Sequence, residues 1–241
     1  MSKINIKNNT PSLLKQLSWL VIFSIAMAYL EAAVVVYLRE IYYPLGFSFP
    51  LTPMNTDIVI VELWREIATI IMLAGIGILT GNTSSQRFAF FLITFAIWDI
   101  FYYVFLYVLV HWPSSLLTWD ILFLVPIPWV GPVITPIIVS LIMLVLASSL
   151  IHFKKNLNLK QWLLLILGSL TVIFSWALDY WNFSSNQFSN GVWTLSSEQE
   201  LFGGSEQYIP SSFNWYIFLF GILLLLTAIV SYYLKNRKLQ K

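Results

Sequence analysis

The sequence contains no cysteine and only two histidines among its 241 residues. The absence of cysteine excludes disulfide bonds, thiolate metal ligands and thiol nucleophiles. His111 and His152 fall at opposite ends of two predicted membrane-crossing helices, so they cannot share a metal ion. Any metal site would therefore consist of oxygen ligands, which suit Mg²⁺, Ca²⁺ or Mn²⁺ better than Zn²⁺ or Cu²⁺.

Charged residues are also scarce, at 10% of the chain, whereas 59% of the residues are hydrophobic and 17% are aromatic. Charged residues make up about a quarter of a typical soluble domain, so the composition excludes a soluble protein. The motifs of zinc peptidases, serine hydrolases, P-loop proteins and dinucleotide-binding folds are missing as well. The sequence predicts a polytopic protein of the lipid bilayer that does not bind nucleic acid.

Apolar runs of about 20 residues, the length that crosses ~30 Å of hydrocarbon as a helix, recur along the chain. The links between these runs are short except for the polar segment 183–212, an expected outer loop that is either a cap or a linker. We expect an all-α bundle forming a single transmembrane domain over residues 1–241, with a proline-broken fourth helix. The six expected helices are 17–42, 58–80, 88–110, 127–151, 161–181 and 213–234.

Basic residues fall on one side of this predicted bundle. With a cytoplasmic N-terminus, every lysine and arginine except Arg39 and Arg65 lies in a cytoplasmic segment. This is the distribution that the positive-inside rule describes. It predicts an integral protein of the inner (cytoplasmic) or plasma membrane with both termini in the cytoplasm. The alternative of a cleaved signal peptide ending at Ala26-Met27-Ala28 is less favoured, because the apolar run continues through Leu38.

Acidic residues fall within the predicted bilayer or on its outer side. Glu31, Glu66 and Asp99, on three consecutive predicted helices, are expected roughly 12 to 16 Å below the outer boundary. A charge at such depth costs about 2.5 to 3.5 kcal/mol on insertion scales, so it should face the bundle interior or a wet cavity. The sequence therefore predicts an acidic site near the midplane that opens to the outer face.

Helical spacing adds neighbours to this site. Glu62 shares a helix face with Glu66, and Tyr102 and Tyr103 are expected to donate hydrogen bonds to Asp99 or to form the wall of a pocket. Arg65 cannot neutralise all the nearby acids, so the remaining charges should be protonated or should bind a cation. The substrate- or ion-binding candidates are Glu31, Glu62, Arg65, Glu66, Asp99, Tyr102 and Tyr103, and the candidate ligands of a divalent cation are Glu31, Glu66 and Asp99.

Four prolines occur in the stretch that begins the fourth predicted helix. Proline lacks an N–H and clashes with the carbonyl four residues earlier, so the freed carbonyls would face a cavity or another part of the protein. The alternative is a kinked or late-starting helix after an interfacial stretch at about 114–125. The candidate residues for gating or for the cavity wall are Pro126, Pro128, Pro132 and Pro136.

Three functions are compatible with this pattern. The first is a small transporter or permease-like protein, in which the acids hold protons or a small cation and Arg65 tunes them. The second is a membrane-embedded enzyme that acts on a lipid or isoprenoid-like substrate through carboxylates, as acid and base or as metal ligands. The third is a scaffold, in which Arg65 pairs with Glu62, Glu31 or Asp99 only to fix the helices. Because catalytic motifs are missing, the transporter is the favoured interpretation.

Overall fold

The computed structural model describes residues 12–125, 127–189 and 207–239. Within them the chain is mainly helical, with six helices and one short hairpin. Five of the helices, all except α2, are long and apolar enough to cross a membrane, which indicates an integral membrane protein. The helices are α1 (Leu13–Tyr42), α2 (Thr56–Thr80), α3 (Ser84–Val110), α4 (Ile134–Phe153), α5 (Leu159–Ser189) and α6 (Trp215–Lys238).

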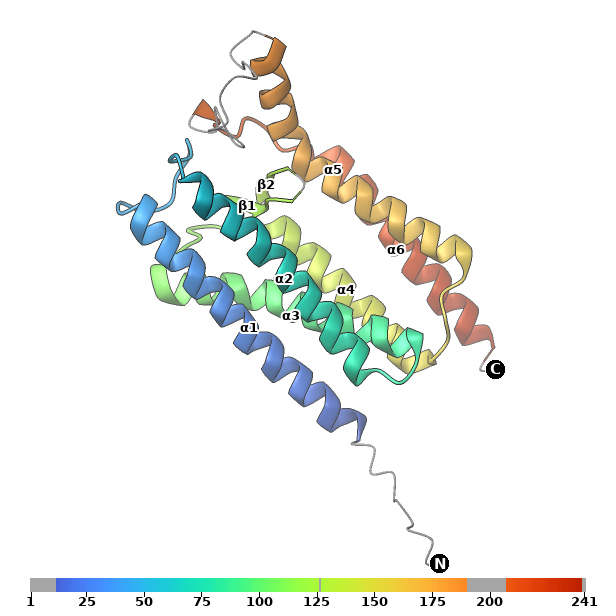
Figure 1. Ribbon diagram of the computed structural model, residues 1–241. Coiled ribbons are helices and arrows are strands. Elements are labelled where there is room, and N and C mark those ends of the chain that lie inside the picture. The colour runs from blue at the N-terminus through green and yellow to red at the C-terminus, as the bar shows by residue number, and fades with distance from the viewer. Residues whose placement is uncertain (1–11, 126, 190–206, 240–241) are drawn as a thin grey trace, which may run out of the picture.

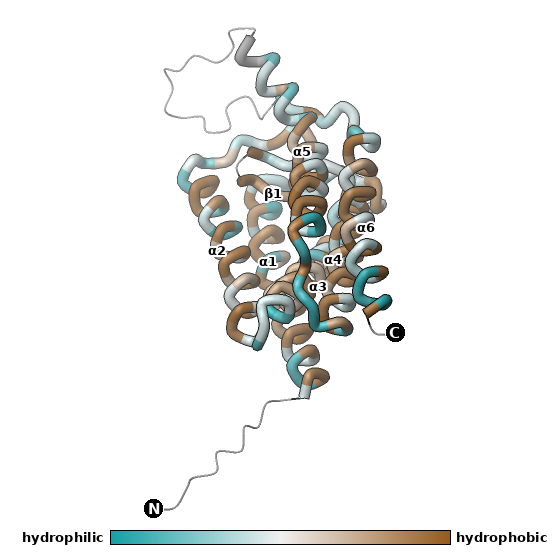
Figure 2. Tube along the Cα trace, turned by 90° about the vertical axis from the view of Figure 1, so that its right-hand side faces the viewer, coloured by the Kyte–Doolittle hydropathy of each residue, from teal (hydrophilic) through white to brown (hydrophobic). Residues whose placement is uncertain are grey.

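The helices lie side by side, with the start of α1 and the end of α6 at the same end of the bundle (Figure 1). α3 is central, because it packs against α1, α2 and α4, whereas α5 packs mainly against α6. Hydrophobic residues predominate along the helices, and hydrophilic residues gather at their ends (Figure 2). We call the end that holds Lys15, Arg87, Lys155 and Arg237 the basic end, and the opposite one the hairpin end.

The hairpin that precedes α4 consists of β1 (Trp119–Phe123) and β2 (Trp129–Pro132), which pair antiparallel. The predicted start of the fourth helix at residue 127 is therefore wrong, because α4 begins at Ile134. Pro132 ends β2 and Pro136 falls in the first turn of α4, where the missing N–H disturbs no helical hydrogen bond. The structure thus agrees with the alternative of a late-starting helix.

The loop before β1 holds the start of α4 in place. The backbone amides of Val133 and Ile134 donate to the carbonyls of Thr118 and Leu116, at 3.0 and 2.8 Å. Amides in the first turn of a helix have no partner within the helix, so these bonds satisfy two of them. The hairpin is consequently fixed to the bundle at its base, and its turn is left to reach over α2.

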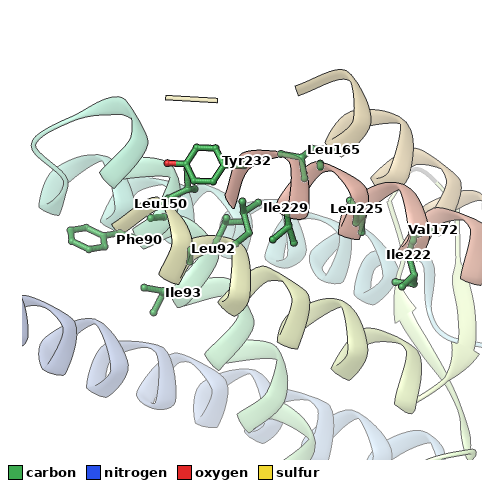
Figure 3. Close-up of a cluster of buried hydrophobic side chains, with 14 of the residues drawn as sticks. Phe90, Leu92, Ile93, Leu150, Leu165, Val172, Ile222, Leu225, Ile229 and Tyr232 are labelled. Atoms are coloured by element: carbon green, nitrogen blue, oxygen red, sulfur yellow. The ribbon is translucent and has the colours of Figure 1, made fainter. Parts of the chain in front are cut away.

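The main apolar core lies among α3, α4, α5 and α6 (Figure 3). Two glycines bring α5 and α6 unusually close. A Cβ on Gly221 would lie 2.8 Å from Val172 Cγ2 and 3.0 Å from the carbonyl oxygen of Gly168. Small residues at such a crossing let two helix backbones approach each other in a membrane. The crossing of α5 and α6 is therefore held mainly by close packing.

The segment 207–212 lies against the hairpin end of α5. Asp179 of α5 accepts hydrogen bonds from the hydroxyls of Tyr208 and Ser211, at 2.8 and 2.7 Å. The ring of Tyr208 is almost fully buried and packs against Tyr180 and Phe49. Part of the predicted outer loop 183–212 therefore covers the bundle, and its residues 190–206 lie outside the described part of the chain.

Candidate functional site

A cavity of about 320 Å³ lies between α1, α2, α3, the hairpin and the segment 43–54. Helical periodicity explains why α1 and α2 each present several lining residues to the cavity. Glu31, Val35 and Leu38 share one face of α1, and Glu62, Glu66 and Thr69 share one face of α2. We call it the acidic cavity. Its ionisable lining residues are Glu31, Arg39, Tyr42, Tyr43, Glu62, Arg65, Glu66, Asp99, Tyr102, Tyr103, Asp120 and Tyr180.

Arg65 joins two helices across the cavity. Its Nε and Nη2 atoms lie 2.7 and 2.6 Å from Glu62 Oε2 on the same helix, and its Nη1 atom pairs with Glu31 of α1. The hydroxyl of Thr69 also donates to Glu31, at 3.2 Å. Two carboxylates thus share a single guanidinium, and the charged groups hold α1 beside α2 where the two helices make few other contacts.

Glu66 holds the turn of the hairpin. Both of its carboxylate oxygens accept the backbone N–H of Leu124, at 2.9 and 3.1 Å. Leu124 follows β1 directly, so this contact ties α2 to the loop between the strands. Within the described residues Glu66 has no cation at salt-bridge distance, and the backbone amide of Leu124 donates to its carboxylate.

Asp99 is placed at the junction of α3 and α4. It accepts a hydrogen bond of 2.7 Å from the hydroxyl of Ser140 on α4. Like Glu66, it lacks an ion-pair partner in the part of the chain that the structure describes. The expected donors Tyr102 and Tyr103 do line the cavity, but the hydroxyl of Tyr103 donates to a different acid.

That acid is Asp120 of β1, which does not stand out in the sequence as a site residue. Its exposed fraction is 2%, and it accepts from the Tyr103 hydroxyl at 3.3 Å and pairs with Arg39 Nη2 at 3.5 Å. Burial raises the pKa of Asp120 to about 6, and the positive charge of Arg39 opposes that rise. The sequence signal that could have identified Asp120 as a site residue is a single carboxylate between Trp119 and the apolar run Ile121-Leu122-Phe123.

Arg39 is held between two aromatic rings. Its guanidinium carbon lies 3.9 Å from the ring centroid of Trp112 and 4.6 Å from that of Phe47. Such stacking stabilises a desolvated cation through the negative faces of the rings. The position of Arg39 in the sequence is typical of an interfacial anchor, whereas the structure buries its side chain to an exposed fraction of 11%.

The three candidate metal ligands, Glu31, Glu66 and Asp99, line the same cavity but have different partners. They are engaged by Arg65, Leu124 and Ser140 respectively. The described residues contain no group of three or more histidine, aspartate or glutamate side chains arranged to hold a metal ion. Of the predicted wall prolines, Pro128 lines the cavity, Pro132 and Pro136 are not among its lining residues, and Pro126 lies outside the described residues.

A scan against protein-family models, a search of curated proteins and a search of solved structures each find no match to this chain. The chemistry of the acidic cavity must therefore be inferred from its own residues. Five carboxylates and two guanidinium groups line one space, so negative groups outnumber positive ones. The excess suits the binding of protons or cations.

Proposed function

We propose that this protein is a small proton- or cation-linked transporter of the permease type. The acidic cavity is its binding site. Glu31, Glu66 and Asp99, with Glu62 beside them, are the carboxylates that hold the proton or cation, and Arg65 is the positive charge that tunes them. The observation that carries the proposal is the excess of carboxylates over guanidinium groups in one cavity. Uncompensated charge in a membrane interior is unfavourable, so a protein that retains it has a use for it.

Glu66 links the binding of a proton or cation to movement of the hairpin. As a carboxylate it makes charge-assisted hydrogen bonds to the Leu124 amide, and these are about twice as strong as neutral ones. Binding of a proton or cation to Glu66 would weaken this hold on the hairpin. The loop beside Pro128 would then move away from α2 and open the cavity, which is the gating role proposed for the proline segment.

The direction of access follows from the distribution of charge. The basic end contains the residues that the positive-inside rule assigns to the cytoplasm, among them Lys154, Lys155, Lys235 and Lys238. We infer that α2 is a sixth crossing, that both termini are cytoplasmic and that the acidic cavity opens at the outer face of the inner or plasma membrane. Protons or cations would therefore enter the site from outside the cell.

One observation favours a second candidate, a membrane-embedded enzyme for a lipid or isoprenoid-like substrate. α1 and α2 pack against α3 rather than against each other, and the lining between them includes the apolar side chains of Val35, Leu38 and Val59. A lipid chain would fit such a lateral wall. This candidate requires carboxylates that act as acid and base or hold a divalent ion.

Thermal unfolding of the purified protein in detergent tests the proposal without knowledge of the solute. Glu66→Gln and Asp99→Asn remove a charge while they keep the shape and most of the hydrogen-bonding capacity. Glu40→Gln is the matched control, because Glu40 is exposed at the hairpin end of α1. The protein is measured with and without Na⁺, Mg²⁺, Ca²⁺ and Mn²⁺, and from about pH 5 to pH 8.

The transporter predicts that wild-type protein is stabilised by acid or by a monovalent cation and that Glu66→Gln and Asp99→Asn lose this response. The control should keep it. Stabilisation by a divalent ion alone, lost in the same variants, would favour the enzyme. If neither ions nor pH affect the wild type, and both acid variants are simply less stable, the acids are structural and the proposal is wrong.

A further inference from the structure

Arg39 and Arg65, the two arginines of the acidic cavity, differ in how their guanidinium groups are satisfied. Arg65 is engaged by two carboxylates at close range. Among the described residues Arg39 makes one long ion pair, at 3.5 Å to Asp120, and its guanidinium also stacks on the rings of Phe47 and Trp112. The rings fix the plane of this guanidinium and leave part of its donor edge unused.

Two buried N–H groups on the wall of the cavity lack acceptors. Arg39 Nη1 and Trp98 Nε1 are both inaccessible to solvent, and neither has a hydrogen-bond partner among the residues that the structure describes. An unsatisfied buried donor costs about 1 to 3 kcal/mol, more when it is charged, so such donors usually have a partner. Both residues line the acidic cavity, so a ligand there could supply the missing acceptor atoms.

We propose that Arg39 binds the anionic group of an organic anion, whose apolar body lies along the aromatic wall formed by Tyr43, Phe47 and Tyr103. This names the substrate class of the transporter and rests on the function proposed above. A planar guanidinium matches a carboxylate or phosphate through paired hydrogen bonds. A volume of about 320 Å³ lies within the range of small-molecule sites.

Asp120 couples this site to protons, because Asp120 and the ligand compete for the same guanidinium. Arg39 of α1 faces Asp120, as do Asp99, Tyr102 and Tyr103 of α3, while Glu62 and Glu66 of α2 and Tyr180 of α5 line the same cavity. A proton on Asp120 releases Arg39 to the anion. One proton and one monoanion then enter together, and the net charge of the cavity does not change.

Two sources of this chemistry are available to a membrane protein, a free organic acid and an anionic lipid headgroup. The probe for the first is benzoate, with benzamide as its neutral isostere. The probe for the second is phosphatidylglycerol, added to nanodiscs of phosphatidylcholine. Binding is measured on the full chain, as a shift in thermal unfolding and by titration calorimetry, for wild type, Arg39→Gln and Asp120→Asn. Lys160→Gln, an exposed lysine at the basic end, is the control.

Benzoate, and not benzamide, should stabilise the wild-type and control proteins, and its affinity should rise as the pH falls. Arg39→Gln should weaken benzoate binding by about tenfold or more, the effect of one charge-assisted hydrogen bond. Asp120→Asn should bind benzoate more tightly than wild type near pH 7.5 and should lose the pH dependence. If phosphatidylglycerol stabilises the wild type and benzoate does not, and Arg39→Gln weakens the binding of phosphatidylglycerol, Arg39 still binds an anion. The ligand is then the lipid headgroup.

The proposal is overturned if Asp120→Asn binds neither benzoate nor phosphatidylglycerol more tightly than wild type does. This result does not depend on whether Arg39→Gln folds. Unchanged affinity in folded Arg39→Gln would overturn it too. Failure of this inference is distinguishable from failure of the proposed function. Glu66→Gln and Asp99→Asn would still abolish the response to acid or cations if only the anion site were wrong.

Discussion

The α5–α6 pair and the α1–α2 pair of the bundle are joined by different kinds of contact. α5 and α6 meet at Gly168 and Gly221 through close backbone contact and apolar side chains. α1 and α2 are joined through Arg65, which pairs with a carboxylate on each helix. Lipid chains are as apolar as leucine, so packing is the economical way to join helices in a membrane, and the use of buried charges needs another reason.

The two halves of the bundle also differ in the polar groups that they contain. Among the described residues, five carboxylates line the cavity of the α1–α3 half, whereas the polar pocket beside α5 has the single carboxylate Asp179 in its lining. Replacing a buried ion pair with apolar groups is often neutral or stabilising, so stability alone would not retain such a cluster. We therefore propose that the charged half carries the binding site and that the packed half supports it.

The largest difference between the two halves is expected at Arg65. Arg65→Gln leaves Glu31 and Glu62 without their cation, and we expect a loss of about 3 kcal/mol in unfolding free energy, the effect of removing one partner of a buried pair. Part of that loss should be recovered in acid, because protonation removes the uncompensated charges. Thermal unfolding at several pH values measures both effects. Arg237→Gln, on an exposed turn of α6, should change little, and equal losses in the two variants would contradict the difference between the halves.

In the packed half the corresponding change is Gly221→Val. The added side chain would meet Val172 and the backbone of Gly168, so we expect a loss of about 2 kcal/mol from overpacking that does not depend on pH. Gly75→Ala is the control, because a Cβ on Gly75 of α2 would have no atom within 4 Å. A pH-dependent loss in Gly221→Val would show that charges also hold the α5–α6 contact.

An effect confined to a pH window is expected at Asp120. Its pKa is raised by burial from the ordinary 3.8 to about 6, so its favourable contribution to stability is fully present below about pH 3.8 and is lost as the pH rises through 6. Asp120→Asn cannot ionise, so it should become progressively more stable relative to wild type as the pH rises from about 4 to 7. A constant difference between the two unfolding curves across that range would contradict the assigned pKa.

The sequence predicts the helices well where apolar runs are long. It also predicts that Glu31, Glu66 and Asp99 share one region, because their depth follows from counting residues along helices. The hairpin was not predictable, since the pairing of Trp119–Phe123 with Trp129–Pro132 is a tertiary contact without a local signal of alternating residues.

Two further features are invisible to hydropathy. α5 continues to Ser189, beyond the expected end at residue 181, because its last turns are polar and a hydropathy pattern ends where polar residues begin. The burial of Arg39 between Phe47 and Trp112 depends on two loops that are distant in sequence. Depth along a helix can be read from the sequence, whereas contacts between loops cannot.

Whether the acidic cavity is water-filled and reached from the hairpin end can be tested with thiol reagents, because the chain contains no cysteine. Thr69→Cys places a thiol on the cavity wall beside Glu31, and Ile71→Cys places one at nearly the same depth on the exposed outer surface of α2. Membrane-impermeant methanethiosulfonates of opposite charge are applied from outside to cells that express each variant. We predict that Thr69→Cys is labelled faster by the cationic reagent than by the anionic one, and that Ile71→Cys, which faces lipid, is not labelled. No labelling of Thr69→Cys, or faster labelling by the anionic reagent, would contradict an acidic cavity open to the outside.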